Sequence, residues 1–219
     1  MDLIVKTRDY FKKKGFDKAV IGLSGGLDSS VVCFLLAKAL GKENVFAFSI
    51  PYYDEDPDVQ KVVDLTGVHF RRVPIKEDVD RLCEKMGVED RVDKGNVMAR
   101  MRMVVLYYFA RKNNALVAGT GNKTEWLLGF FTKHGDIACD FLPIGALYKT
   151  QVRELARELG VPEEIIKKDP TPGFWPGHTD EEELGFSYDE LDSRLKKGGE
   201  GLEERMLHTE HKRKGADVL

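Results

Sequence analysis

Short apolar runs alternate with longer amphipathic stretches along most of the chain. Runs of strand length, bounded by polar or small residues, lie at 18–23, 45–50, 69–74 and 115–119. Helical spacing of apolar residues lies at 2–14, 28–40, 56–66, 95–113 and about 149–159, and a further apolar stretch, 141–144, precedes the last of these. Strands that alternate with such helices are typical of βαβ units. We therefore expect an α/β fold, doubly wound, with helices on both faces of a mostly parallel, five-stranded sheet.

The pattern changes after Gly160. The segment KDPTPGFWPGH is interrupted by Pro and Gly, an acidic stretch follows, and helical spacing returns at about 187–196 and near 201–213. Nothing in this part has the composition of a flexible linker. We expect a single domain, 1–219, with a helical C-terminal lobe at about 161–219.

Composition narrows the class of protein. The chain has 219 residues, of which 42% are hydrophobic and 32% charged, and its net charge of −3 gives no bias toward nucleic acid. No apolar run approaches the roughly 18 residues that span a bilayer, and the N-terminus does not resemble a signal peptide. The cysteines, Cys33, Cys83 and Cys139, form no CxxC pair. We expect a cytoplasmic protein with reduced thiols and neither a membrane nor a nucleic-acid partner.

The segment VIGLSGGLDSSVV, residues 20–32, begins as a strand and ends as a helix. Gly25 and Gly26 permit close backbone approach, and the N–H groups that start the helix favour an anion such as phosphate. The segment lacks the lysine of the GxxxxGK[ST] loop. Asp28 would repel a bare triphosphate, but it fits a site where Mg²⁺ bridges it to phosphate oxygens. The alternative is an ordinary tight turn in which Asp28 caps the helix.

Three further positions have candidate chemistry. Thr120 lies at a second strand end, between two glycines, where a nucleotide could approach. Lys149 begins a helix, where its charge is unfavourable unless an anion lies beside it. In 95–113, helical spacing places Arg100 at the edge of the apolar face, where it needs an anionic partner, and points Arg102 outward. Alternatively, Arg100 forms an internal salt bridge.

SGGLDSS resembles the signature of the PP-loop ATP pyrophosphatases, which split ATP into AMP and pyrophosphate. Further segments in the same order resemble the ammonia-dependent NAD synthetases over nearly the full length: GNVMARMRM, GTGNKTEWLLGFFTKHGD, DFLPIGALYKTQVRELA, KDPTPG, ELGFSYDELD and TEHKR. This resemblance implies a homodimer that amidates deamido-NAD with ammonia. The nicotinate carboxylate would attack ATP to give an acyl adenylate, and ammonia would then release NAD and AMP.

The resemblance also implies site residues. It places Mg²⁺ on Asp28 and Glu125, and the catalytic charges on Asp28, Glu125 and Lys149. ATP would contact Gly22, Leu23, Ser24, Gly25, Gly26, Leu27, Asp28, Ser29, Thr120, Lys149 and Thr171. Deamido-NAD would contact Arg100, Lys133, Asp140, His211 and Lys212. The segment 173–180 departs from the family pattern, so no role is inferred for Phe174, Trp175 or His178.

Read without the resemblance, most of these positions have structural alternatives. Glu125 could be an exposed helical carboxylate, Lys133 a solvated lysine, and Asp140 and Thr171 turn residues. Other functions also stay open: a tRNA-modifying PP-loop enzyme, a non-catalytic nucleotide-binding module, or an interaction protein. A glutamine-using enzyme needs a second catalytic domain, for which 219 residues leave no room. We therefore expect free ammonia, or ammonia delivered by a separate protein.

Overall fold

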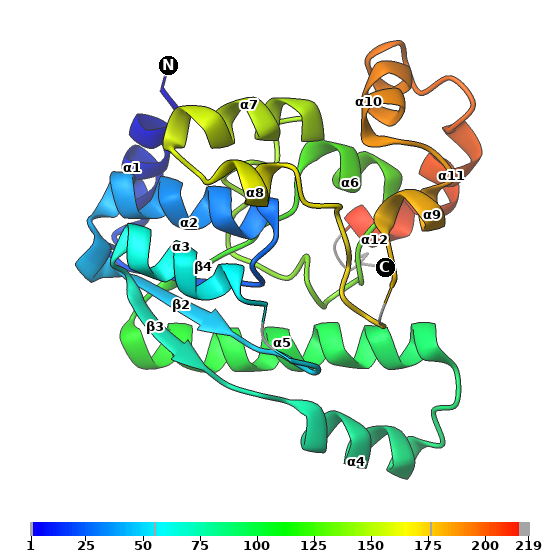
Figure 1. Cartoon of the computed structure of the whole chain (residues 1–219), viewed down its shortest axis with the longest axis horizontal. Helices are drawn as coiled ribbons and strands as arrows, with labels where there is room; N and C mark the ends of the chain where they lie inside the picture. Colours follow the sequence, from blue (N-terminus) through cyan, green and yellow to red (C-terminus); the bar gives the residue numbers. More distant parts are fainter. Residues whose placement is uncertain (1, 55, 176, 215–219) are drawn as a thin grey trace, which may run out of the picture.

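A four-stranded parallel sheet forms the centre of the protein. The computed structural model describes residues 2–54, 56–175 and 177–214. The strands are β1 (Ala19–Gly22), β2 (Val45–Ser49), β3 (His69–Arg72) and β4 (Leu116–Ala118), and their order is β3-β2-β1-β4. All three pairings are parallel (Figure 1), which confirms the predicted α/β class.

The predicted number of five strands is wrong for the described residues. Phe141 makes only an isolated parallel bridge with Ala118, and the chain then turns. Pro143 lacks the backbone N–H that a continuing ladder needs, so this apolar stretch does not become a strand.

Helices cover both faces of the sheet, as the doubly wound prediction requires. One face packs against α1 (Leu3–Lys14), α2 (Leu27–Leu40), α3 (Asp58–Thr66) and α7 (Lys149–Leu159) (Figure 1). The other face packs against α4 (Lys76–Met86) and α5 (Arg91–Asn113). Successive β1 residues point to opposite faces of the sheet. Ile21 packs in the first apolar cluster, with α1, α2, α3 and α7, and Val20 packs in the second, with α4 and α5.

The helix α4 was not predicted from the sequence, and α5 begins at Arg91, four residues before the predicted start at 95. In α4, Val79 and Cys83 are four residues apart and both are buried against the sheet. The helix α5 begins at Arg91 because the Asp90 side chain accepts hydrogen bonds from the backbone N–H groups of Val92 and Asp93. A short helical turn, η1 (Lys42–Asn44), connects α2 to β2.

The described C-terminal part is helical. It contains α8 (Glu163–Ile166), α9 (Asp180–Leu184), α10 (Tyr188–Lys196), α11 (Glu203–His208) and α12 (Glu210–Arg213). Ile165 and Ile166 belong to the first cluster of the sheet domain, whereas Leu184 and Leu191 form a third cluster with Leu128 of α6 (Lys123–Leu128). The ends of the predicted 1–219 domain lie outside the described residues. No described helix is long and apolar enough to cross a membrane.

Candidate active site

The two predicted strand-end turns lie side by side at one edge of the sheet. After β1 the chain forms β2 and β3 on one side and then returns to form β4 on the other. Ligands bind in open α/β sheets at this kind of switch point, outside the carboxyl ends of the strands. A cavity of about 570 Å³ lies there, and its lining includes Ser24 after β1 and Thr120 after β4.

The turn after β1 presents an uncapped helix N-terminus. Gly26 is the N-cap residue of α2, and among the described residues no side-chain hydrogen bond caps the start of this helix. The serine hydroxyls stabilise the turn instead: Ser29 Oγ donates to the Gly26 carbonyl at 3.1 Å and Ser30 Oγ at 2.8 Å, while Ser24 N donates to Ser29 Oγ at 3.2 Å. The first N–H groups of a 14-residue helix are therefore available to phosphate oxygens. The alternative in which Asp28 caps this helix is wrong.

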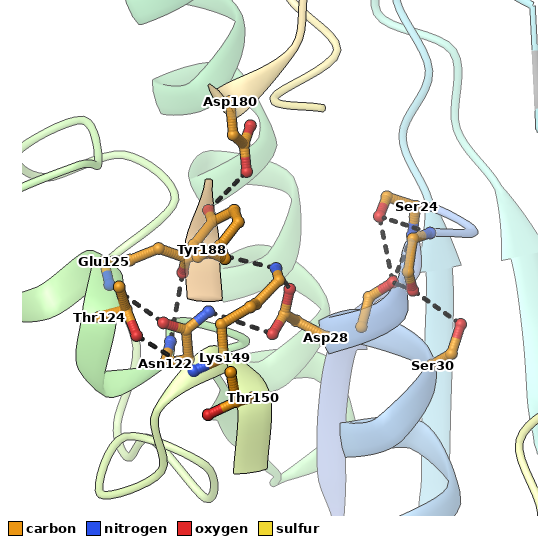
Figure 2. A network of polar contacts seen from close by, with 12 residues as sticks. Ser24, Asp28, Ser30, Asn122, Thr124, Glu125, Lys149, Thr150, Asp180 and Tyr188 are labelled. Atoms are coloured by element: carbon orange, nitrogen blue, oxygen red, sulfur yellow. Dashed lines mark hydrogen bonds and ion pairs between the residues drawn. The ribbon is translucent and has the colours of Figure 1, made fainter. Parts of the chain in front are cut away.

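A buried lysine lies between two carboxylates at the centre of the site (Figure 2). Lys149 is 3% exposed, and its ammonium donates a hydrogen bond to Asp28 and lies 3.6 Å from Glu125 Oε1. The amide of Asn122 donates to Asp28 Oδ1 at 3.2 Å. Segments far apart in the sequence therefore bring one positive and two negative groups together beside the α2 N-terminus.

Local helix-capping geometry fixes Glu125. Asn122 and Glu125 form a capping box at the start of α6: Glu125 N donates to Asn122 Oδ1 at 3.0 Å, and Asn122 N donates to Glu125 Oε2 at 3.2 Å. One carboxylate oxygen of Glu125 thus holds the helix start while the other faces Lys149. The sequence analysis did not identify Asn122, although the N-x-x-E spacing in GNKTEW indicates it.

The N-terminus of α7, which carries Lys149, is held from two directions. Lys149 N donates to Thr124 Oγ1 at 3.0 Å, and Thr150 N donates to Asp192 Oδ2 at 2.8 Å. Thr124 Oγ1 in turn donates to Asp192 Oδ1. Asp192 lies on α10, so the C-terminal helices help to set the position of the candidate catalytic lysine.

The charges in this cluster do not cancel. Burial, together with the nearby Asp28 carboxylate, raises the pKa of Glu125, and Lys149 only partly opposes this effect. Burial alone would lower the pKa of Lys149, but the Asp28, Glu125 and Asp180 carboxylates outweigh it and the pKa of Lys149 is raised. The ammonium therefore stays charged. Ionising Glu125 beside Asp28 would create an excess of negative charge, which a divalent cation would neutralise.

The donor set fits Mg²⁺ that is shared with a nucleotide. No group of three or more His, Cys, Asp and Glu side chains in the described part of the chain is arranged to hold a metal ion. Protein sites for Mg²⁺ commonly use one or two carboxylates together with phosphate oxygens and water. Asp28 and Glu125, next to the turn after β1, provide such a pair.

Most of the predicted site residues share the cavity. Those that line it are Gly22, Leu23, Ser24, Gly26, Leu27, Asp28, Ser29, Thr120, Glu125, Lys149, Thr171 and Lys212. Gly25 belongs to the same turn and has φ +83°. Thr171 Oγ1 also accepts a hydrogen bond from Gly173 N at 3.0 Å, so the structural alternative and the predicted contact coexist.

The other four positions predicted to contact deamido-NAD do not line the cavity. Arg100 is exposed, and its guanidinium donates to the carbonyl of Lys133 at 3.3 Å. Asp140 Oδ2 accepts from Val117 N at 2.7 Å, and His211 is exposed on α12. Their contact with substrate remains a prediction.

The predicted orientation of the two arginines of α5 is wrong. Arg100 points outward, whereas Arg102 lines the cavity and its Nε donates to the Ile50 carbonyl at 3.1 Å. The predicted buried face was centred on all apolar residues of the helix, including Val104 and Tyr108. These two side chains are in fact 55% and 61% exposed. The buried face of α5 instead contains Met98 and its neighbours, so the helix is rotated relative to the predicted face. Further charged cavity residues were also missed, among them Asp136, Lys168 and Asp180.

Comparison with known proteins identifies the family of this chain. A sequence model of the NAD synthase family matches residues 2–217. The NH3-dependent NAD synthetase of Chlorobium phaeobacteroides is 48% identical over 188 residues, which are 84% of this chain and 68% of that protein.

Solved structures agree with the sequence match. NMN synthetase from Francisella tularensis superposes with a TM-score of 0.91 at 34% identity, covering 99% of this chain and 95% of that one. The NH3-dependent NAD synthetase of Campylobacter jejuni, solved with a nitrate ion, superposes with a TM-score of 0.81 at 32% identity, covering 100% and 99%. The family model covers nearly the whole chain and the Chlorobium relative is 48% identical, so the chain belongs to the NAD synthase family.

Proposed function

We propose that this protein is an ammonia-dependent NAD synthetase, which uses ATP to amidate deamido-NAD. The observation that carries the proposal is the buried Lys149 ammonium between Asp28 and Glu125, beside the uncapped N-terminus of α2. This arrangement suits a reaction in which pyrophosphate leaves, because negative charge then accumulates where the ammonium and the backbone N–H groups converge.

In the first step, a nicotinate carboxylate oxygen bonds to the α-phosphorus of ATP, and the bond from that phosphorus to the bridging oxygen of pyrophosphate breaks. Lys149 and the first backbone N–H groups of α2 bind the departing pyrophosphate. Mg²⁺, when held by Asp28 and Glu125, supplies neutralisation of phosphate charge. In the second step, ammonia attacks the carbonyl carbon of the acyl adenylate, AMP leaves and the amide loses a proton.

This reaction needs no side-chain nucleophile. The thiols of Cys33, Cys83 and Cys139 are free. Burial raises the pKa of Cys33 to about 12, so it stays a neutral, inert thiol within α2. Free thiols also suit the reducing cytoplasm, where we place the reaction as part of this proposal.

The proposal is tested by following pyrophosphate and NAD together. Purified protein is mixed with ATP, Mg²⁺ and ammonium, with and without deamido-NAD. Both products should appear in equal amounts, and only when deamido-NAD is present. Binding of ATP without turnover would favour the nucleotide-binding module instead.

A mononucleotide is a second candidate substrate. The NMN synthetase of Francisella tularensis has the higher TM-score of the two solved structures named above, and four positions predicted to contact the dinucleotide lie outside the cavity. Nicotinate mononucleotide carries the same carboxylate. Measuring kcat/KM for both acids in competition identifies the preferred substrate.

The predicted homodimer is part of the proposal, and one face of α5 supports it. Arg100, Val104 and Tyr108 follow each other at intervals of four residues, so they share an exposed face on which the last two are apolar. A second copy on this face would bury those side chains and bring its own groups to Arg100. This would explain how a residue outside the cavity contacts the substrate.

We expect Val104→Lys to convert a dimer to a monomer, because a lysine ammonium would be buried without a partner in the interface. Light scattering on the purified protein measures the mass. Leu207→Lys is the matched control, since Leu207 is 73% exposed on α11 and its replacement should leave the mass unchanged. A monomeric wild-type protein would contradict this prediction.

The thermal stabilisation by Mg²⁺ should increase with pH. Without metal, Glu125 has a raised pKa, so the folded protein keeps its proton at pH values where the unfolded chain has already released it. The stability contributed by this group therefore falls as pH rises between its ordinary value of 4.5 and the raised value. Mg²⁺ must displace the proton within that window, so its binding is weaker at low pH.

The measurement is Tm with and without Mg²⁺ from about pH 6 to about pH 9. Glu125→Gln is the control and should remove most of the pH dependence of the Mg²⁺-induced shift. A shift that is the same at every pH in the wild-type protein would contradict the role of Glu125.

A further inference from the structure

A third carboxylate faces the same site from the C-terminal helices. Asp180, the first residue of α9, is 5% exposed and lines the cavity together with Asp28, Glu125 and Lys149. Its Oδ2 accepts a hydrogen bond from the hydroxyl of Tyr188 at 2.6 Å. Its Oδ1 is buried and has no hydrogen-bond partner among the residues that the structure describes.

Tyr188 connects Asp180 to the lysine of the site. The ammonium of Lys149 lies 4.7 Å from the centre of the Tyr188 ring, and Figure 2 shows the ring between the two charged groups. Tyr188 is fully buried at the start of α10, so the hydrogen bond to Asp180 fixes both the ring and the carboxylate. The Asp180 charge also acts on Lys149 directly, as one cause of its raised pKa.

The fold gives only a small reason for an ionisable group at this position, because a carboxylate in the first turn of the five-residue helix α9 gains little from the helix dipole. A buried carboxylate with an unpaired oxygen destabilises a protein, and an amide of the same shape would avoid that cost while keeping an acceptor for the tyrosine hydroxyl. Burial accordingly raises the pKa of Asp180, although Lys149 and Tyr188 oppose this. A charged group that weakens the fold and faces the reaction centre is typical of active sites.

The reaction itself explains the need for a third carboxylate. In the structure, Lys149 is held by Asp28 and approached by Glu125. When Asp28 and Glu125 bind a divalent cation, as proposed above, Lys149 loses the two carboxylates that hold its ammonium. Asp180 is then the remaining carboxylate among the named cavity residues that acts on the ammonium.

We propose that Asp180 is a positioning residue, which together with Tyr188 holds the Lys149 ammonium in place while Asp28 and Glu125 bind the cation. This inference rests on the proposed function, and it gives the C-terminal helices a part in catalysis. Asp180 acts through Lys149 and touches neither substrate.

The primary test is Asp180→Asn in the full-length protein. We expect kcat to fall about tenfold, as for groups that orient a catalytic side chain, while KM for ATP stays within about twofold. Tm should stay the same or rise, because the unpaired buried charge is removed. Glu182→Gln is the matched control: it removes an exposed carboxylate from the same helix and should change neither kcat nor Tm.

Combined variants separate positioning from a general structural effect. In protein that already carries Lys149→Met, Asp180→Asn should not lower the residual rate further, because its effect passes through the lysine. Tyr188→Phe keeps the ring but removes the hydroxyl, and should lower kcat by a similar factor without adding to Asp180→Asn.

Four results would overturn the inference. The first is an Asp180→Asn variant with the same rate as Glu182→Gln, and the second is an Asp180→Asn variant that lowers the rate of Lys149→Met further. The third is an Asp180→Asn variant whose kcat falls only together with its Tm, and the fourth is an Asp180→Asn variant that does not fold. Wild-type protein that makes no amide product would instead overturn the proposed function, and the inference with it.

Discussion

Replacing Lys149 with Met should lower kcat by about a thousandfold, the effect expected for removing a charge that acts on the leaving group. The ammonium is 3% exposed and contacts Asp28 and Glu125, so no water-exposed group can replace it at short range. The protein should also lose about 3 kcal/mol of unfolding free energy near pH 8, because two partly buried carboxylates lose their buried counter-charge. This loss should be smaller near pH 6, where Glu125, whose pKa is raised by burial, can take up a proton.

The measurements are steady-state pyrophosphate release and urea unfolding at the two pH values. Lys38→Met is the matched control, since Lys38 is exposed on α2, the helix that carries Asp28. It should leave both rate and stability nearly unchanged. A Lys149→Met protein with more than about a tenth of the wild-type rate would show that the leaving group does not depend on this ammonium.

Replacing Gly25 with Ala should lower kcat/KM for ATP by at least about a hundredfold. At φ +83° a side chain is strained, and the new Cβ would lie 2.9 Å from Cβ of Asp56. Asp56 cannot move away freely, because its carboxylate accepts from Lys168 and, at 2.9 Å, from Asp58 N. The phosphate-binding turn must therefore shift, and a displacement of about 1 Å at a reacting group can cost about a hundredfold in rate.

Gly87→Ala separates the steric effect from the backbone strain. Gly87 has φ +69° at the end of α4, and among the described residues no atom outside its immediate neighbours lies within 4 Å of the position that a Cβ would occupy. We expect this variant to lose about 1 kcal/mol of stability and to keep its activity. Equal kcat/KM for Gly25→Ala and wild-type protein would mean that the turn tolerates the side chain.

The α/β class and the two strand-end turns could be predicted from the sequence, because their signals are local. The apolar runs of strand length and the glycines at 25 and 26 depend on neighbouring residues only. The resemblance added Glu125 and Lys149, which have ordinary local alternatives, and the structure places both beside Asp28. The capping box of Asn122 and Glu125 was also readable from spacing, although it was missed.

Tertiary structure decided what depends on distant contacts. The helix α5 buries a different face from the one that periodicity indicates, because Val104 and Tyr108 remain exposed, and so Arg102 rather than Arg100 enters the cavity. The apolar stretch at 141–144 has the composition of a strand, but it pairs at one residue only. No spacing rule connects Asp180 to Lys149, since they lie on separate helices that come together only when α10, which follows α9, packs against α7.

Local sequence patterns therefore determined most of the elements and the places of the two strand-end turns. Packing between elements determined the rotation of each helix and which charges meet, because burial free energy is summed over contacts that are distant along the chain.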